Sequence, residues 1–264
     1  MPGLSAVVIT RDEQRNIERC LGALSFCDEI VVVDSGSRDQ TVAIAEKFGA
    51  KVFVNPFKDF TSQKNFAASR ATGTWILSID ADEVVTPPLR EEILHRLKAS
   101  GGFAAYALPR RNFIFGKQLR FGGSGRDTPV RLFRKGQARF EGVVHESLRV
   151  DGDVGRLKEP LLHYSTPDTR RYFQKLTLYA ALEAKALDQR SAVFRSAAIF
   201  WRPLGRFLQR YFIQGGFLDG YAGFLFAVLS SYYEFVRYAI FWEIFSGFFD
   251  RIDQSLPSLA EVKS

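Results

Sequence analysis

The first eighty residues alternate short apolar runs with segments of helical periodicity, and this alternation limits the possible folds more than any other feature. Four apolar runs predict strands at residues 4–10, 29–34, 51–54 and 75–79. Between them, apolar residues recur at helical spacing in residues 11–24, 42–48 and 61–70. Strands separated by helices over short connections predict an α/β fold with a mostly parallel sheet flanked by helices.

Polar residues follow three of these predicted strands. They occupy residues 10–13, 34–39 and 80–83, where the first, second and fourth strands end. In open parallel sheets, ligands bind beyond the carboxyl ends of the strands. The sequence therefore predicts one polar site at a single edge of the sheet.

The third of these segments, in WILSIDADEV, brings Asp80, Asp82 and Glu83 together. Alone, such a turn is compatible with a solvated loop, a metal site or the nucleophile of a haloacid-dehalogenase-type phosphatase, whose DxDx[TV] pattern DADEV fits. That phosphatase also needs a later acidic pair, and no convincing pair follows in the sequence. Carboxylates one residue apart can reach a hard cation that holds a phosphate, and the two upstream strand ends favour this interpretation.

The second strand runs into DSGSRDQT, and the kind of ligand can be narrowed from it. The chain has no GxGxxG after its first strand and no Walker A sequence, which argues against a dinucleotide-binding Rossmann domain and a P-loop. Asp34 can accept hydrogen bonds from a base or a ribose, whereas Ser37 or Asp39 can cap the next helix. We expect both roles, with nucleotide contact by Asp34 and capping by Asp39.

Taken in order, LSAVVITRDEQRNIERCL, VVVDSGSRDQT, QKNFAAS and WILSIDADE resemble the successive motifs of family-2 inverting glycosyltransferases with the GT-A fold. The resemblance covers at least residues 4–150 and implies a nucleotide-sugar donor, usually a UDP-sugar, and a divalent metal, Mg²⁺ or Mn²⁺. Many relatives carry Asn where Asp12 stands here. The donor-binding residues that the resemblance implies are Thr10, Arg11, Glu13, Asp34, Gln63, Lys64, Asp80 and Ala81, with Asp82 at the metal.

From about residue 101 the alternation ends, and strands and loops rich in Arg and Gly are expected. The pattern DxxxRLF of the resembling family points to Arg131 as a contact of the diphosphate or of an anionic acceptor. An inverting transfer needs a base to take the proton of the acceptor hydroxyl. A VHE sequence follows in the resembling subfamily, which makes Glu146 the candidate base instead of a surface carboxylate. His145 would orient Glu146 or contact the acceptor. His163 is either structural or a further metal ligand.

The net charge of +7 suits an anionic partner. With a nucleotide-sugar site, the expected partners are the donor and an anionic membrane surface, and not nucleic acid. Cys20 and Cys27 form no metal pattern and are expected to be reduced core residues. Arg11 and Asp12 interrupt the first apolar run too early for a signal peptide, so a cytoplasmic location is expected.

The last hundred residues carry many of the 25 phenylalanines and predict helices. One predicted helix, which Pro203 kinks or restarts, sets arginines against an aromatic face. Such a helix suits an anionic membrane surface, and the alternative is that its aromatic face packs on the catalytic domain. The arginines of this stripe are Arg195, Arg202, Arg206 and Arg210.

The uncharged run between Asp219 and Glu234 is shorter than the ~20 residues of a spanning helix, so a monotopic attachment is expected. The stretch GFLDGYAGFLFA is similar to the tail of lipopolysaccharide core β-1,4-glucosyltransferases, which glucosylate an inner-core heptose. We therefore expect a GT-A domain at residues 1–165 and a helical, membrane-associating region at residues 166–264.

These observations lead to a functional hypothesis with one close rival. The chain is expected to move a hexose, glucose by resemblance, from a UDP-sugar to a lipid-linked acceptor, an inner-core heptose of lipopolysaccharide, at the cytoplasmic face of the membrane. The rival is a polyprenyl-phosphate glycosyltransferase, which uses the same donor site and a phosphate acceptor that needs no strong base. A non-catalytic membrane scaffold would leave the three polar strand ends unexplained.

Overall fold

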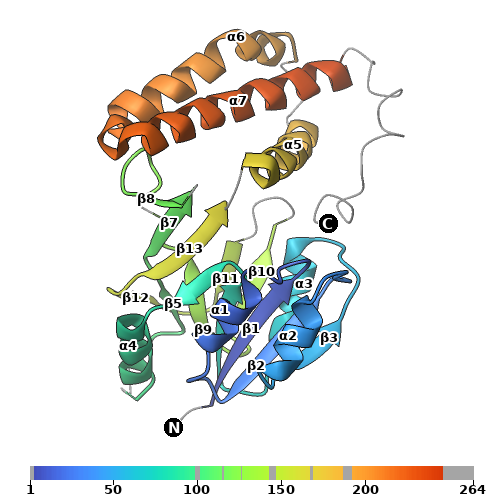
Figure 1. The fold of residues 1–264 in the computed structure, drawn as a ribbon, viewed down its shortest axis with the longest axis vertical. Helices are drawn as coiled ribbons and strands as arrows, with labels where there is room; N and C mark the ends of the chain where they lie inside the picture. The colour runs from blue at the N-terminus through green and yellow to red at the C-terminus, as the bar shows by residue number, and fades with distance from the viewer. Residues whose placement is uncertain are drawn as a thin grey trace. The chain divides into compact units, whose positions relative to one another are not determined.

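The computed structural model describes residues 3–98, 102–114, 116–125, 127–142, 147–166, 169–186 and 192–245. These residues form two compact units (Figure 1). The first unit holds residues 3–111 and 127–165, and the second holds residues 112–125 and 166–245. The expected division after residue 165 did not include the short segment 112–125, which groups with the C-terminal helices.

A seven-stranded sheet organises the first unit, in the strand order β12-β6-β9-β4-β1-β2-β3. Its pairs β1–β2, β1–β4, β2–β3 and β6–β12 are parallel, whereas β9 is antiparallel to both of its neighbours. The predicted α/β class with a mostly parallel sheet is confirmed. The strands are β1 (Leu4–Thr10), β2 (Glu29–Asp34), β3 (Lys51–Val54), β4 (Trp75–Asp80), β6 (Ala105–Ala107), β9 (Val130–Arg134) and β12 (Val154–Arg156).

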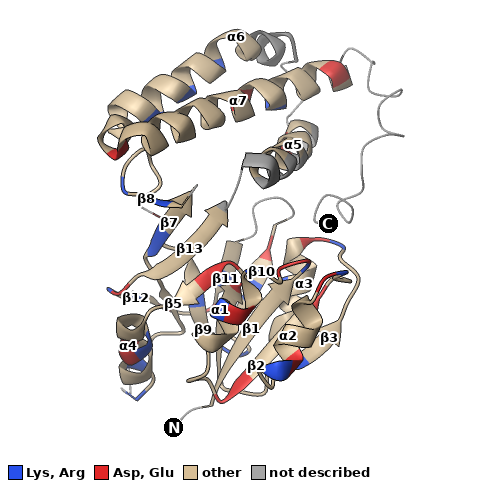
Figure 2. Cartoon of the chain, viewed as in Figure 1, with Lys and Arg blue, Asp and Glu red and all other residues tan. Residues whose placement is uncertain are grey.

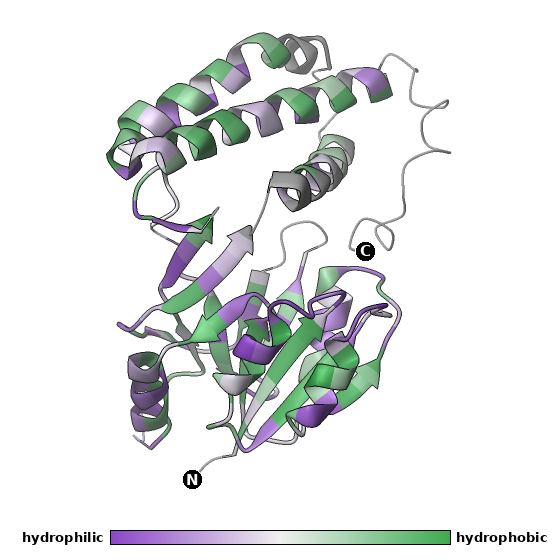
Figure 3. Cartoon of the chain, viewed as in Figure 1, coloured by the Kyte–Doolittle hydropathy of each residue, from purple (hydrophilic) through white to green (hydrophobic). Residues whose placement is uncertain are grey.

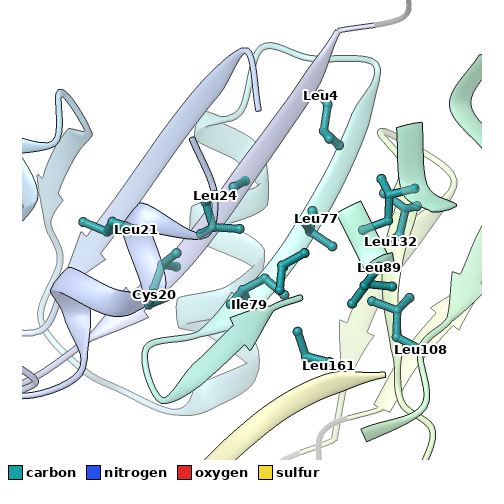
Figure 4. Packing of buried hydrophobic residues seen from close by; sticks show 14 of the residues in the cluster. Leu4, Cys20, Leu21, Leu24, Leu77, Ile79, Leu89, Leu108, Leu132 and Leu161 are labelled. Carbon is teal, nitrogen blue, oxygen red and sulfur yellow. The ribbon is translucent and has the colours of Figure 1, made fainter. Parts of the chain in front are cut away.

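Helices cover both faces of this sheet because successive strand residues point to opposite sides. On one face α1 (Ile17–Gly22), α2 (Thr41–Lys47) and α4 (Pro87–Lys98) pack on the larger core, part of which Figure 4 shows. On the other face, α3 (Phe60–Arg70) packs on a second core. Cys20 is buried in the larger core, and both cysteines are free, as expected.

The register brings the predicted polar segments to one edge. Thr10 pairs with Asp34 across β1 and β2, and Ile9 pairs with Asp80 across β1 and β4. Two antiparallel pairs complete the unit: β5 (Glu83–Val85) with β13 (Leu161–Thr166), and β10 (Ala138–Glu141) with β11 (Ser147–Val150). The first of these pairs sets His163 opposite Glu83 and so brings β13 to the acidic turn.

The second unit consists of helices and one hairpin. The helices are α5 (Thr169–Ala186), α6 (Ala192–Leu208), the π-helical turn η2 (Gln209–Ile213), the 3-10 turn η3 (Gly216–Asp219) and α7 (Gly220–Phe245). The hairpin is formed by β7 (Arg110–Ile114) and β8 (Lys117–Leu119). Helix α6 continues through Pro203, so the predicted restart there is not found.

The hairpin is tied to the helices of its own unit. Ile114 and Leu119 share a small apolar cluster with Ala222 of α7. The carboxylate of Asp219 accepts hydrogen bonds from the backbone N–H groups of Arg120 and Phe121, at 3.0 and 2.9 Å. This packing explains why the hairpin groups with residues that follow it by about a hundred positions.

Helix α7 and the turn before it, Gly216–Ile244, meet the length and composition of a membrane-spanning helix. A core helix of a soluble protein passes the same test. Figure 3 shows α6 and α7 as mostly hydrophobic along their lengths. The apolar C-terminal helical region that the sequence predicts is therefore present.

Candidate functional site

The carboxylate of Asp34 organises the loop that follows β2. Oδ1 accepts a hydrogen bond from the Thr10 hydroxyl at 3.0 Å, and Oδ2 accepts from the backbone N–H groups of Gly36 and Ser37, at 2.9 and 2.8 Å. The residue is 1% exposed. Both oxygens thus have partners within the protein, and the predicted contact of Asp34 with the nucleotide stays a prediction.

The loop after β1 is bound to the loop after β2 through Asp12. This residue has a φ of 51°, a left-handed conformation in which Asp and Asn are enriched. Its backbone N–H donates to the Ser37 hydroxyl at 2.8 Å, and its Oδ1 accepts from the backbone N–H of Arg38 at 2.7 Å. The Asn of many relatives can adopt the same backbone conformation, so the departure at Asp12 is compatible with the loop seen here.

Arg11 and Asp12 leave buried polar atoms at this edge. Arg11 Nε and Asp12 Oδ2 lie 3.8 Å apart, and neither has a hydrogen-bond partner among the described residues. Buried polar groups without a partner are uncommon and call for a ligand, an ion or a water. Arg11 Nε is therefore available as a hydrogen-bond donor at this edge, and its contact with the nucleotide-sugar stays a prediction.

Three other predicted residues shape the same loops. The N–H of Glu13 donates to Thr41 Oγ1 at 2.8 Å, which joins the first loop to the start of α2. The carboxylate of Asp39 accepts from the backbone N–H of Thr41 at 3.0 Å, so Asp39 holds the first N–H of the helix. Gln63 is fully buried, and its amide donates to Ser35 Oγ at 2.9 Å.

Asp80 lies between two cations at the end of β4. Its Oδ1 is 3.3 Å from Lys64 Nζ, and its Oδ2 is 2.6 Å from Arg131 Nη2. Burial would raise the pKa of Asp80, but Arg131 and Lys64 outweigh it and hold that pKa well below its ordinary value. Asp80 is therefore ionised at neutral pH. Ala81, which follows it, is 5% exposed.

Glu83 holds the acidic turn in place through two ion pairs and one backbone hydrogen bond. It is fully buried, and its Oε1 lies 2.6 Å from Arg131 Nη2 and 3.0 Å from Arg110 Nη1, while its Oε2 accepts from the backbone N–H of Asp80 at 3.0 Å. Arg110 Nε in turn donates to Asp127 Oδ2 at 2.8 Å. Neither Arg110 nor Asp127 was predicted from the sequence as a site residue. Asp127 begins the DxxxRLF pattern, which could have pointed to Asp127 but contains no signal for Arg110.

The two predicted metal ligands lie together. His163 Nε2 is 3.5 Å from Asp82 Oδ1, and each side chain is 14% exposed. The backbone N–H of Tyr164 donates to the Asp82 carbonyl at 2.9 Å, which holds β13 against the turn. Among the described residues, no three His, Cys, Asp or Glu side chains form a metal-binding group. A carboxylate and an imidazole suit a cation that takes its other ligands from substrate phosphates and water.

The predicted base Glu146 and its neighbour His145 lie outside the described residues. The flanking residues are described, with Glu141 paired to Ser147 across β10 and β11. Asn65 of α3 donates from Nδ2 to the Phe140 carbonyl at 2.9 Å and accepts from the Phe140 N–H at 3.0 Å. The helix that carries Lys64 therefore also holds the hairpin whose connecting loop contains Glu146.

Replacing Arg131 with methionine should destabilise the first unit by about 3–5 kcal/mol, because it leaves the carboxylates of Asp80 and Glu83 without their shared cation. Urea unfolding followed by circular dichroism measures the change. The control is Arg139→Met, at an exposed position of β10. A loss below about 1 kcal/mol in Arg131→Met would show that the ion-pair network is not needed for folding.

The sequence of this chain is similar to those of known proteins over most of its length. The family model "Glycosyl transferase family 2" matches residues 5–147. An uncharacterized glycosyltransferase of Rickettsia felis is 32% identical over 256 residues, which cover 90% of this chain and 89% of that protein. The lipopolysaccharide core biosynthesis glycosyltransferase LpsC of Rhizobium meliloti is 29% identical over 244 residues, which cover 89% and 90%.

Among solved structures, that of S. aureus TarS 1-349 aligns with a TM-score of 0.47 and 15% identity over 93% of this chain and 92% of that chain. The stretch that matches the family model begins in β1 and ends at the start of β11. It thus contains both strand-end loops, the acidic turn and Arg131.

Proposed function

This chain belongs to glycosyl transferase family 2 and is a glycosyltransferase, and we propose that it is an inverting, metal-dependent enzyme that takes a hexose, glucose in the simplest case, from a UDP-sugar. The observation that carries the proposal is the cluster at the carboxyl edge of the sheet. There Lys64 and Arg131 hold the Asp80 carboxylate, and Asp82 lies beside His163. Two cations next to a pair of metal-ligating side chains suit a nucleotide diphosphate.

Asp82 and His163 are the residues that would hold Mg²⁺ or Mn²⁺. A bound cation offsets the negative charge that develops on the departing diphosphate. Arg131 and Lys64 add positive charge from the protein, and Glu83 fixes the turn through the backbone N–H of Asp80. The loops ordered by Asp34 would receive the nucleoside, and the unsatisfied Nε of Arg11 would donate to it or to its ribose.

Glu146 would serve as the base of the transfer. The acceptor hydroxyl oxygen forms a bond to the anomeric carbon while the bond from that carbon to the UDP oxygen breaks, and the hydroxyl proton passes to the carboxylate of Glu146. Attack from the face opposite the leaving UDP inverts the anomeric configuration. In the sequence Glu146 comes directly before β11, whose partner strand β10 is held by Asn65 of α3, and this supports the role.

The acceptor that we propose is lipid-linked, an inner-core heptose of lipopolysaccharide at the cytoplasmic face of the membrane. The similarity to LpsC over 89% of the chain supports this acceptor class. The apolar α6 and α7 support a location on the membrane, where a lipid-linked glycan would be within reach of a peripherally attached enzyme.

Donor binding tests the proposal directly. Saturation-transfer NMR on the whole chain, with a panel of UDP- and GDP-sugars, should give signals for the UDP-sugars that strengthen when diamagnetic Mg²⁺ is added. UDP-glucose should give the strongest signal. A panel without any UDP-dependent signal would overturn the proposed function, and UDP binding that does not depend on Mg²⁺ would contradict the metal dependence.

A further inference from the structure

The helices of the second unit present a broad apolar surface. Figures 2 and 3 show α6 and α7 with few charged residues and with hydrophobic residues along their lengths. Some of these side chains are largely exposed, with Phe200 of α6 at 83% and Tyr221 of α7 at 76%. Aromatic side chains of this kind are enriched where proteins meet a membrane interface.

Two of the three charged residues of α7, Glu234 and Arg237, do not lie on that exposed surface. Glu234 is 2% exposed and accepts hydrogen bonds from Arg206 of α6, at 2.6 Å from Nη2. Arg237 contacts the same carboxylate and also lies 2.7 Å from Glu183 of α5. These residues interrupt the apolar run in the sequence, but ion pairing inside the helical unit neutralises them.

A pocket that is lined in part by arginines lies on α6 within the helical unit. It has a volume of about 160 Å³ and is lined by Trp201, Arg202, Gly205, Arg206, Gln209 and Glu234. This is well above the ~10–15 Å³ that one water molecule needs on the same measure, and it is enough for a phosphate group. We call it the α6 arginine pocket.

The arginines of this pocket have donors available. Three N–H groups of Arg206 donate to Glu234 and Gln209, which leaves two of its five N–H groups without a partner among the described residues. The Arg202 guanidinium lies 4.9 Å from the ring of Trp201, and within the described chain no carboxylate pairs with it. A Cβ added at Gly205 would meet no atom within 4 Å, so this side of the pocket is open.

We propose that the α6 arginine pocket binds the phosphate of an anionic bilayer lipid. Guanidinium groups match phosphate oxygens in geometry and lose less hydration than ammonium groups do. The lining favours a lipid over a free anion, because Trp201, which lines the pocket, is 47% exposed. A lipid would cover this side chain, whereas a soluble phosphate would leave it in water. The inference rests on the membrane location in the proposed function and adds a defined headgroup site to it.

Vesicle cosedimentation of the full-length protein tests this site, with phosphatidylcholine vesicles that contain or lack phosphatidylglycerol. Arg202→Gln should weaken binding to the phosphatidylglycerol vesicles about fivefold, the contribution of one arginine near an anionic surface. Binding to pure phosphatidylcholine should stay unchanged. Gly205→Leu should give a similar loss by filling the pocket, although it leaves every charge in place.

The matched control is Arg120→Gln, which removes an exposed arginine of the same unit outside the pocket. It should leave the preference for phosphatidylglycerol within about twofold. If Arg120→Gln lost as much vesicle binding as Arg202→Gln, or if Gly205→Leu lost none, net charge alone would explain the binding. Either result would overturn the proposal. Inorganic phosphate that competed at the same concentration as the lipid would also overturn it, by assigning the pocket to a free anion.

UDP-glucose binding, measured on the same samples, separates this proposal from the proposed function. The Arg202 and Gly205 variants should bind UDP-glucose as the unmodified protein does. If the unmodified protein selects phosphatidylglycerol through the pocket but does not bind UDP, the donor assignment fails and the lipid site stands. If it binds UDP but lacks the lipid preference, the lipid site fails alone.

Discussion

Replacing Glu146 with glutamine is expected to lower the turnover of sugar transfer by about 10²–10⁴-fold, the usual contribution of a positioned general base. Glutamine has nearly the shape of glutamate but cannot take the acceptor proton. The affinity for UDP should stay unchanged, because the donor contacts that we propose lie at Asp80, Asp82 and the loops after β1 and β2. Steady-state kinetics and UDP titration on the same preparation measure both quantities.

A second glutamate of the same hairpin provides the control for this substitution. Glu141 is half-exposed on β10 and lies 3.8 Å from Arg149, so Glu141→Gln should change turnover by less than about twofold. Full activity in Glu146→Gln would show that Glu146 is not the base of the transfer. If that variant remained active with a polyprenyl phosphate as acceptor, the rival reaction would be favoured, since a phosphate acceptor is already ionised and needs no strong base.

Asp82→Asn should lower metal-dependent turnover by about 10³-fold. A catalytic cation contributes several kcal/mol to the stabilisation of charge, and each 1.36 kcal/mol corresponds to a tenfold change in rate. The amide keeps the shape of the side chain but loses its negative charge, so Mn²⁺ should bind more weakly while the unfolding transition stays in place. Titration of the activity with Mn²⁺ measures the affinity for the metal, and urea unfolding measures whether the stability is unchanged.

The contact between Asp82 and His163 allows a sharper version of the same experiment. If both side chains hold one cation, the double variant Asp82→Asn, His163→Gln should be hardly slower than Asp82→Asn alone, because residues that act as a unit are not additive. Asp151→Asn, at an exposed carboxylate of the same unit, is the control. Independent, additive losses at the two positions, or turnover at the original rate in Asp82→Asn, would contradict the metal site.

Much of the first unit could be predicted because its determinants are local. Apolar runs of four to seven residues predict β1 to β4, and the structure places all four strands there. Parallel connection then brings their carboxyl ends to one edge, as the chain order predicts. The pairing of β4 with β1, which sets Asp80 opposite Ile9, was decided by the tertiary structure. The family membership also follows from linear motifs, and it was confirmed by the match over residues 5–147.

The partner that each polar side chain contacts was decided only by the tertiary structure. Asp34 turns into its own loop, where backbone N–H groups occupy it, whereas Lys64 reaches Asp80. Arg110 carries no distinguishing pattern in the sequence, and its role depends on Glu83, which is 27 positions away. Long-range ion pairs of this kind are chosen by packing, and local periodicity contains no information about them.

The same distinction holds for the C-terminal helices. The sequence by itself determined that they are apolar, aromatic and striped with arginine, since these are properties of composition and helical spacing. It did not determine that Glu234 and Arg237 are turned inward, or that the segment 112–125 joins the helices. Those features depend on contacts between elements that lie from 28 to about a hundred residues apart in the sequence. Burying a charge is tolerated only where a partner from another element neutralises it.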